Sequence, residues 1–325
     1  MLCAPRRCGF NDVLNQIWMA CQLALNEDRR LIIDTRMSGL WDDLDNYLTP
    51  LQSTRITARL TDESLEQLNR MTCYPRRWQS QVDFMHRETQ VRMAGAGRPR
   101  RASRVMAYVI GSLLLPGHTP FSGTLMRRLR FAGTSPARLM PTGQLRARKE
   151  ELVVLHSSGG GPHGVEVLRL FTLTTDVRRA VRSARTLLGD DYDAIHIRHT
   201  DLRTNYKPLL RQAATELSGR KVLICSDDPA VVAEARAALS ESTVISLASP
   251  RESAGVGLHK IGAHLSLPQR RMINTAMLVD LMALAGSSRL LVAPTHDGNT
   301  SGFSLLATSL RQNPSLVASL LGHAP

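Results

Sequence analysis

The second half of the chain alternates between short apolar runs and longer stretches of helical periodicity. Apolar runs at 192–197, 222–225, 243–247 and 290–293 have the length of buried strands. Between and after them, apolar positions recur at helical spacing over 209–217, 270–285 and 302–310, and Pro229 stands where a helix tolerates proline, at its first turn. Asp176 is predicted to cap one more helix, whose apolar face comprises Val177, Val181, Ala184 and Leu188. This alternation predicts a mostly parallel, doubly wound α/β sheet.

The first half begins in the same way and then loses its pattern. An amphipathic helix is expected over 13–24, followed by a strand that ends at Asp34, and another strand is expected over 153–155. Arginine, glycine and proline crowd the segment from Arg87 to Arg104, which indicates a mobile basic loop, and helices are expected over 105–115 and 121–131. We predict two α/β domains, residues 1–173 and 174–325, and a long loop over 248–268.

Composition narrows the class of protein. A chain of 325 residues with 43% hydrophobic content has enough apolar side chains for two cores. Its longest apolar stretches fall short of a membrane helix, and no signal-peptide core follows the first residues. The five cysteines are odd in number and lack metal-ligand spacing. We therefore expect a cytoplasmic protein with free thiols, no transmembrane segment and no metal site.

The formal net charge of +13 raises the possibility of nucleic-acid binding. Of the 41 basic residues only four are lysine, and arginine suits phosphate recognition. Aromatic residues make up only 4% of the chain, and no basic stripe carries the interleaved aromatics that stack on bases. A solvated surface that also attracts anions is the favoured explanation, and no nucleic-acid partner is expected.

The run from Ala194 to Asp201 carries the most specific chemistry. It places His196, Arg198 and Asp201 at the carboxyl end of an apolar strand, where open α/β sheets bind their ligands. Strand alternation puts His196 and Arg198 on one face, and the planar guanidinium fork of arginine matches a pyrophosphate. The purely structural alternative is an ion pair between Arg198 and Asp201 at the strand end, with His196 as a satisfied, partly buried side chain.

This run and four other short blocks occur in the order found in a known family. The sequence resembles the nucleotide-sugar fucosyltransferases of the α1,6 and nodulation type, whose HxRxxD segment corresponds to His196, Arg198 and Asp201. The first of the other four is the opening block, which comprises Gly9-Phe10-Asn11-Asp12 and Asp34-Thr35-Arg36-Met37-Ser38. The remaining three are Cys225-Ser226-Asp227-Asp228-Pro229, Leu278-Val279-Asp280-Leu281 and Ser301-Gly302-Phe303-Ser304. The resemblance implies a GT-B-like fold with two Rossmann-like domains facing a cleft, and transfer of a sugar, expected to be fucose, from a GDP-sugar donor to a glycan hydroxyl.

The same resemblance implies roles for the donor-side residues. Arg198 would bind the β-phosphate, His196 would lie near the nucleoside, and Asp201 would hold the loop. Asp227 and Asp228 would matter for activity, although Asp228 is equally well explained as a helix cap. Since arginine neutralises the diphosphate, no metal and no cofactor are expected.

Three further blocks supply substrate-binding candidates. Asp280 lies in an apolar helical pattern where a buried acid needs N–H donors, which a guanine edge offers, and a solvent-facing position is the alternative. Ser301 and Phe303 begin a helix whose N-terminus can receive phosphate, and Ser301 is equally a helix cap. Phe10 and Asn11 belong to a loop that faces the nucleotide in the family. The alternative interpretation of that segment is a tight turn in which Asn11 or Asp12 is the cap. The glycines at 159–161 indicate either a flexible loop or a phosphate contact.

The sequence also departs from the family. His199 stands where a second basic residue is usual, and Tyr206 stands where members of the family tend to carry an acid. A general base must then come from elsewhere, with Asp34, Asp42 and Asp43 as candidates, or the substrate itself activates the hydroxyl. Because this acid is missing, a catalytically silent nucleotide-binding or glycan-binding protein is one alternative. Because the net charge is strongly positive, a basic nucleic-acid-binding protein is another.

Overall fold

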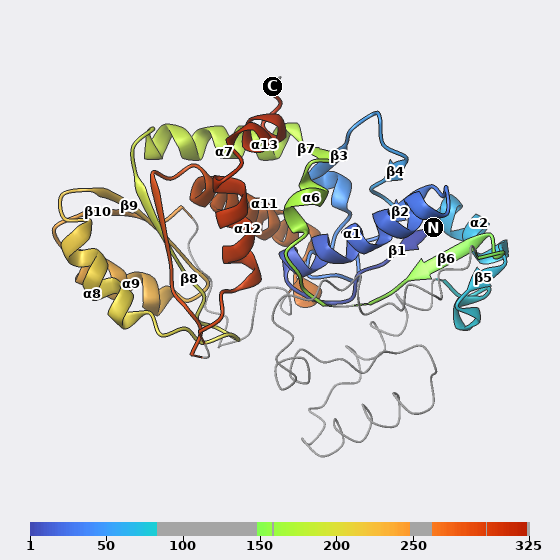
Figure 1. The fold of residues 1–325 in the computed structure, drawn as a ribbon, viewed down its shortest axis with the longest axis horizontal. Coiled ribbons are helices and arrows are strands. Elements are labelled where there is room, and N and C mark those ends of the chain that lie inside the picture. Colours follow the sequence, from blue (N-terminus) through green and yellow to red (C-terminus); the bar gives the residue numbers. More distant parts are fainter. Residues whose placement is uncertain (83–147, 158, 248–261, 297, 324–325) are drawn as a thin grey trace, which may run out of the picture. The chain divides into compact units, whose positions relative to one another are not determined.

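The computed structural model of the chain describes residues 1–82, 148–157, 159–247, 262–296 and 298–323 (Figure 1). The chain forms two compact units, one of residues 1–62 and 153–325 and a smaller one of residues 63–152. The predicted boundary at residues 173 and 174 falls inside the larger unit and remains a prediction. The expected basic loop at 87–104, the helices at 105–115 and 121–131, and most of the expected loop at 248–268 lie outside the described residues.

A parallel sheet of strand order β10-β9-β8-β11 forms the carboxyl-terminal half of the larger unit. Alternate residues of its central strands enter different clusters of apolar side chains. Ile195 and Ile224 pack with helices α8 and α9, whereas Ala194 and Leu223 pack with the cluster that contains α7 and α11. Helices therefore cover both faces, as the alternating pattern predicts. The elements are α7 (Thr175–Leu188), β8 (Asp193–Ile197), α8 (Lys207–Glu216), β9 (Lys221–Ser226), α9 (Pro229–Ala238), β10 (Thr243–Ile245), α11 (Leu267–Ala285) and β11 (Arg289–Val292).

A second parallel sheet, with strands in the order β4-β2-β1-β6, belongs to the first half of the chain. Helix α1 (Phe10–Asn26) follows its central strand, and Val13, Leu14 and Ile17 on the inner face of that helix are fully buried. A short antiparallel pair, β3 with β7, lies outside both sheets. The strands are β1 (Leu2–Cys3), β2 (Leu31–Ile33), β3 (Leu48–Pro50), β4 (Ile56–Thr57), β6 (Leu152–Leu155) and β7 (Phe171–Leu173).

The remaining elements are short or terminal. In the larger unit they are η1 (Leu44–Asn46), α6 (Gly164–Leu168), η4 (Gly262–His264), α12 (Gly302–Arg311) and α13 (Pro314–Leu320). The described part of the smaller unit holds α2 (Asp62–Arg70), whose first residue belongs to the larger unit, β5 (Cys73–Tyr74) and η2 (Arg76–Trp78).

Three local predictions were wrong, each at a helix start. The N-cap of helix α7 is Thr174, two residues before the predicted Asp176, which lies inside the first turn. Gly9 is the N-cap of α1, so Asn11 and Asp12 belong to its first turn and are not cap residues of a tight turn. Helix α11 begins at Leu267, within the expected loop, because Ser266 and Gln269 form a capping box around Pro268. The caps predicted at Asp228 and Ser301 are confirmed, since each side chain accepts a backbone N–H of its helix.

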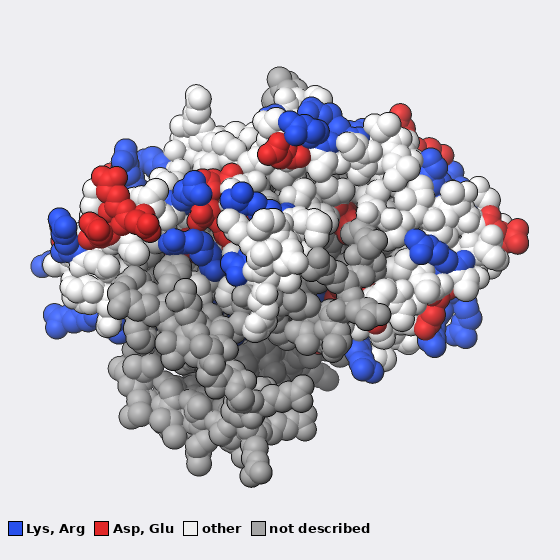
Figure 2. All heavy atoms as spheres, turned by 180° about the vertical axis from the view of Figure 1, so that it is seen from behind, with Lys and Arg blue, Asp and Glu red and all other residues white. Residues whose placement is uncertain are grey.

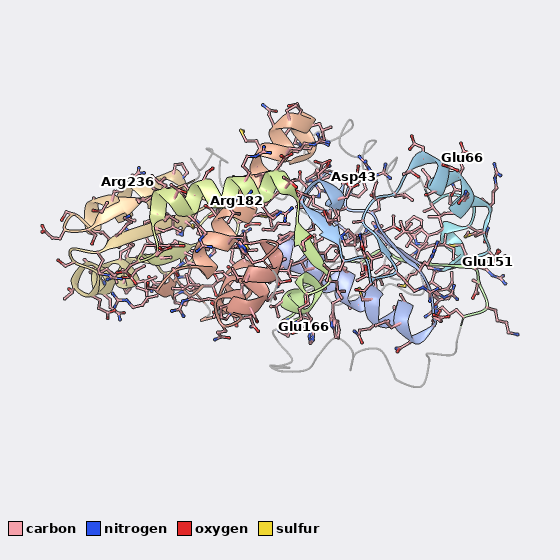
Figure 3. All side chains as sticks on the ribbon, turned by 90° about the horizontal axis from the view of Figure 1, so that it is seen from above. Asp43, Glu66, Glu151, Glu166, Arg182 and Arg236 are labelled. Atoms are coloured by element: carbon pink, nitrogen blue, oxygen red, sulfur yellow. The ribbon has the colours of Figure 1, made fainter. Side chains whose placement is uncertain are left out.

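Charged side chains lie mainly on outer surfaces. Arg182 on α7 and Arg236 on α9 are exposed and point away from the sheet (Figure 3). On the face shown in Figure 2, lysine and arginine are interspersed with aspartate and glutamate, and no continuous basic stripe crosses the described atoms. Among the described helices, none combines the length and apolarity needed to cross a bilayer.

Candidate functional site

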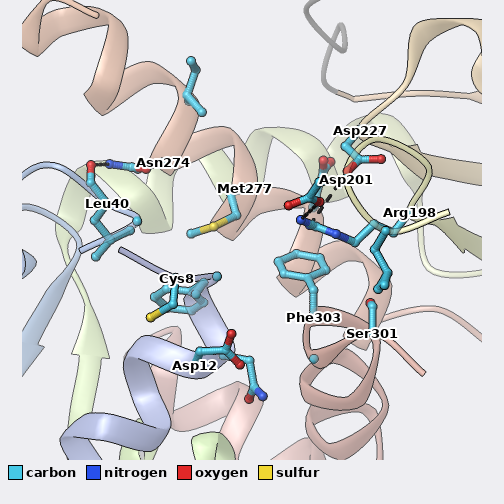
Figure 4. A pocket seen from close by; sticks show the side chains of 18 of the residues that line it. Cys8, Asp12, Leu40, Arg198, Asp201, Asp227, Asn274, Met277, Ser301 and Phe303 are labelled. Atoms are coloured by element: carbon cyan, nitrogen blue, oxygen red, sulfur yellow. Dashed lines mark hydrogen bonds and ion pairs between the residues drawn. The ribbon is translucent and has the colours of Figure 1, made fainter. Parts of the chain in front are cut away.

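A pocket of about 590 Å³ opens at the carboxyl ends of β8 and β9. Part of its lining comes from the segment around the start of α1, with Gly39, Leu40 and Gly159 beside it. The rest comes from the strand ends with α11 and the start of α12 (Figure 4). Loops after parallel strands meet at one edge of the sheet, so residues distant in sequence converge there. The lining is mixed, with apolar groups such as Phe303 and Met277 beside charged ones such as Arg198 and Asp12.

Arg198 lies just beyond the end of β8 and is held by two carboxylates. Its Nη2 donates to Asp201 Oδ1 at 2.6 Å, and its Nη1 lies 3.8 Å from Asp227 Oδ2. Asp227 in turn accepts the backbone N–H of His199 and the hydroxyl of Thr200. The ion pair predicted at the strand end is therefore present. Because the Arg198 side chain is 23% exposed and lines the pocket, the same clamp orients a guanidinium toward a ligand.

His196 is buried on β8 and connects the strand to helix α12. Its Nδ1 lies 2.6 Å from Ser304 Oγ, which lies 2.8 Å from Ser301 Oγ. Burial, assisted by the charge of Arg198, lowers the pKa of His196 to about 3. The imidazole is consequently neutral at physiological pH, and it serves as a hydrogen-bonding group rather than a cation.

Asp280 presents an unsatisfied oxygen on α11. The Cys225 thiol donates to its carboxylate, whereas Asp280 Oδ1 is buried and has no hydrogen-bond partner among the described residues. Burial raises the pKa of Asp280 to about 7, against a smaller opposing effect of the Cys225 hydrogen bond. A buried carboxylate oxygen left without a donor beside a cavity is costly unless a ligand supplies one, so Asp280 is a candidate binding position for an N–H group.

The glycine segment at 159–161 is hydrogen-bonded to amide side chains of α1. Asn11 and Asn15 donate to the Gly161 carbonyl at 3.0 and 2.8 Å, and Gln16 donates to the Gly159 carbonyl at 2.7 Å. A Cβ at Gly160 would lie 2.5 Å from Asp12 Oδ1, so a larger residue here would displace that carboxylate. The amide group of Asn11 therefore has a structural partner in addition to its place in the pocket wall.

Of the ten site residues predicted from sequence, all but Asp228 line this one pocket. Asp228 caps α9 by accepting the backbone N–H of Ala230, and it stays outside the lining. The binding roles of all ten remain predictions. The nine that line the pocket are Phe10, Asn11, His196, Arg198, Asp201, Asp227, Asp280, Ser301 and Phe303.

Several lining residues were not predicted from sequence. Asn274 on α11 donates to the Leu40 carbonyl and to Tyr47 Oη, which joins this wall of the pocket to the segment after β2. Its only sequence signal is a polar residue within an otherwise apolar helical pattern, the same signal that identified Asp280. Arg7, whose guanidinium carbon lies 5.6 Å from the centre of the Trp41 ring, gives no pattern of its own.

No protein-family model matches the sequence, and no curated protein matches it. Solved structures do match. A NodZ α-1,6-fucosyltransferase soaked with GDP-fucose is 18% identical with a TM-score of 0.56, covering 95% of this chain and 92% of that one. The same enzyme co-crystallized with GDP is 16% identical with a TM-score of 0.53, covering 95% and 91%.

The fucosyltransferase NodZ from Bradyrhizobium, also 16% identical, has a TM-score of 0.54 and the match covers 95% of this chain and 92% of that one. At such low identity, the likeness establishes the fold alone. The resemblance inferred from five short blocks is thus confirmed at the level of the fold, and the predicted GT-B-like α/β class is confirmed with it.

Proposed function

We propose that this chain is a glycosyltransferase that transfers a sugar, fucose, from a GDP-sugar to a hydroxyl group of a glycan, without a metal ion. The observation that carries this proposal is that Arg198 and the unpartnered Asp280 Oδ1 line the same pocket. A guanine base offers the adjacent N–H groups that one carboxylate can accept, and a diphosphate offers the oxygens that a guanidinium binds. The likeness of the fold to structures soaked with GDP-fucose or crystallized with GDP supports the same donor class.

In this proposal the pocket residues bind different parts of the donor. Asp280 selects guanine, and His196 with Ser301 lies beside the nucleoside and the phosphates. Arg198 compensates the negative charge that grows on the departing diphosphate, a contribution of about 3 kcal/mol to the barrier for each preorganised donor. Since this positive charge is supplied by arginine, we expect no divalent ion. All five cysteines are free and buried, which suits the reducing cytoplasm that we propose as its compartment.

The test of donor recognition is thermal stabilisation by nucleotides. GDP is expected to raise the melting temperature more than UDP or ADP at equal concentration, because a ligand bound only by the native state shifts unfolding by mass action. The Asp280→Asn variant is the matched control, and it should respond to the three nucleotides alike. Equal responses of the unaltered protein would remove the case for a guanine site.

The test of the reaction is GDP release from GDP-fucose in the presence of a chelator. Turnover should persist, and its loss on chelation with recovery in manganese or magnesium would assign the enzyme to the metal-dependent class. Tyr206 stands in place of an acid, is 5% exposed, and donates its hydroxyl to Glu234 at 2.9 Å. Because this position supplies no carboxylate base, a catalytically silent binding protein is the alternative. Stabilisation by GDP without any release of GDP from the donor would favour that alternative.

A further inference from the structure

A transferase that uses a hydroxyl acceptor must remove the hydroxyl proton, and the three acids suggested by sequence do not reach the pocket. None of Asp34, Asp42 and Asp43 contributes to its lining. Asp34 binds Arg36 at 3.0 Å, and Asp42 accepts hydrogen bonds from Tyr47, Asn46 and the backbone of Asp43. The base must therefore come from another element.

Among the described residues, four carboxylates line the pocket, and three are already engaged. Asp201 pairs with Arg198, and Asp227 accepts from His199 and Thr200. Asp280 accepts from the Cys225 thiol on β9, and its free Oδ1 is assigned to guanine in the proposed function. The fourth, Asp12, accepts only the backbone N–H of Gly9 at the start of its own helix. It therefore keeps lone pairs for a ligand.

Asp12 is also placed on the correct side of the pocket. It stands in the first turn of α1, and its carboxylate points into the space that Arg198 and Phe303 border from the opposite side (Figure 4). Its charge interacts with that of Arg198, which is not the case for Asp280. In the proposed function Arg198 binds the β-phosphate, and the transferred sugar carbon lies one oxygen atom beyond that phosphorus. The reacting carbon then lies near Arg198, whose charge Asp12 senses across the pocket.

We propose that Asp12 is the general base of the reaction, an inference that rests on the proposed function. The acceptor oxygen attacks the anomeric carbon and forms the new glycosidic bond. The bond from that carbon to the β-phosphate oxygen breaks, and its electron pair leaves with GDP beside Arg198. The acceptor proton passes to the Asp12 carboxylate, which becomes a carboxylic acid and later releases the proton to water.

The environment of Asp12 suits this task. Burial raises the pKa of Asp12, while the charge of Arg198 and the Gly9 N–H oppose the rise. A bound diphosphate neutralises Arg198, which weakens that opposition and makes the carboxylate a better proton acceptor. Asp12 is fixed to the first turn of α1, and the glycine at position 160 leaves the space that its carboxylate occupies.

The experiment compares the unaltered protein with Asp12→Asn, which keeps an oxygen for the Gly9 N–H but cannot take a proton. The control is Asp176→Asn, which also removes an acid from the first turn of a helix but lies on the exposed surface of α7. Each protein is assayed for melting temperature, for stabilisation by GDP, and for GDP release from GDP-fucose with water or an oligosaccharide mixture as acceptor. Sodium azide serves as a second acceptor, because the azide anion has no proton to remove.

Asp12→Asn should lose at least about a hundredfold in transfer to hydroxyl acceptors, keep its stabilisation by GDP, and still form the glycosyl azide. Asp176→Asn should behave like the unaltered protein in all three assays. Hydroxyl transfer by Asp12→Asn at the unaltered rate would overturn the inference. So would a loss of the azide reaction together with hydroxyl transfer, since Asp12 would then act in some way other than as a base.

A pH profile of the unaltered protein tests the inference even if Asp12→Asn does not fold. At saturating donor, turnover should rise with pH through one ionisation, because the base acts as its carboxylate. Saturation removes the effect of Asp280 on donor binding, and burial keeps the Cys8 thiol protonated by raising its pKa. The other titratable groups on the pocket are Arg7, His196, Arg198, Asp201, Cys225 and Asp227. A flat acid side of the profile would contradict the inference, whereas a protein that neither binds GDP nor releases it from GDP-fucose would refute the proposed function itself.

Discussion

The two ends of strand β8 both carry an ion-pair network of aspartate and arginine, yet only the network at the carboxyl end lines the pocket. At the amino end, Asp193 is completely buried and accepts hydrogen bonds from Arg220 at 2.9 Å and from Arg289 at 2.9 and 3.1 Å. At the carboxyl end, Arg198 is held by Asp201 and lies near Asp227. The residue types are the same, and the difference lies in what remains unpaired around them.

At the amino end the charges are balanced within the protein. Burial by itself raises the pKa of Asp193, but the hydrogen bonds of Arg289 and Arg220 outweigh that effect and lower it. At the carboxyl end, Asp280 Oδ1 has no partner among the described residues, and the pKa of Asp280 is raised to about 7. A satisfied network stabilises the fold, whereas a group left unsatisfied next to a pocket indicates a ligand.

The largest expected effect is that of Arg198→Lys at the pocket end. Lysine keeps the charge but loses the planar fork, so two directed hydrogen bonds to phosphate become one mobile contact. Turnover of GDP-fucose should fall on the order of a hundredfold, while the melting temperature changes little because Asp201 and Asp227 still face a cation. Both quantities are measured on one purified variant. A destabilised variant with normal turnover per folded molecule would show that Arg198 has only a structural role, like the arginines at the amino end of β8.

A smaller effect is expected for GDP affinity in Asp280→Asn. The amide cannot accept two N–H groups of guanine as a carboxylate does, and a hydrogen bond to a charged group contributes about 1.5–3 kcal/mol. Titration calorimetry should show GDP binding weakened on the order of tenfold to a hundredfold, with UDP binding almost unchanged. An equal loss for both nucleotides would show that Asp280 does not read the base.

The same substitution at the amino end should affect stability alone. Asp193→Asn removes the charge that two arginines share, although both are partly exposed and can turn toward water. A loss of about 1–3 kcal/mol in the free energy of unfolding is expected, measured by urea denaturation. GDP binding to the folded variant should be unchanged, and a change in it would link this network to the pocket.

The last expected effect is a pH dependence of the stability of the unliganded protein. Because the pKa of Asp280 is raised in the folded state, folding favours its protonated form, and stability declines as pH rises from about 4 to about 7. Above that range the penalty is constant. Asp280→Asn removes it, so the variant should exceed the unaltered protein in stability at pH 8 by more than at pH 5. Denaturation at both pH values measures this difference, and a constant difference would show that Asp280 is not strained in the free protein.

The sequence determined the elements and the edge of the sheet at which the site lies. Helical periodicity located α7, α8 and α11, and apolar runs located β8, β9 and β11, because these patterns arise from burial along one local element. Five short blocks in family order predicted a fold that the structure confirms, and nine predicted residues occur together in one pocket. Helix starts were less well predicted, since Thr174, Gly9 and Ser266 precede the expected positions and the choice of cap depends on backbone geometry.

Only the tertiary structure decided which of those side chains remain available. Asp12, Asp34, Asp42 and Asp280 are all acids with apolar residues nearby, and their local sequence does not say which of them find partners within the folded protein. Packing supplies Asp34 with Arg36 and Asp42 with Tyr47, whereas Asp12 and Asp280 face the pocket with lone pairs unused. Arg36 and Tyr47 are near Asp34 and Asp42 in sequence, but they reach these carboxylates only in the folded backbone, and the charge of Arg198 reaches Asp12 from a distant segment. The availability of a carboxylate is therefore a property of the folded chain.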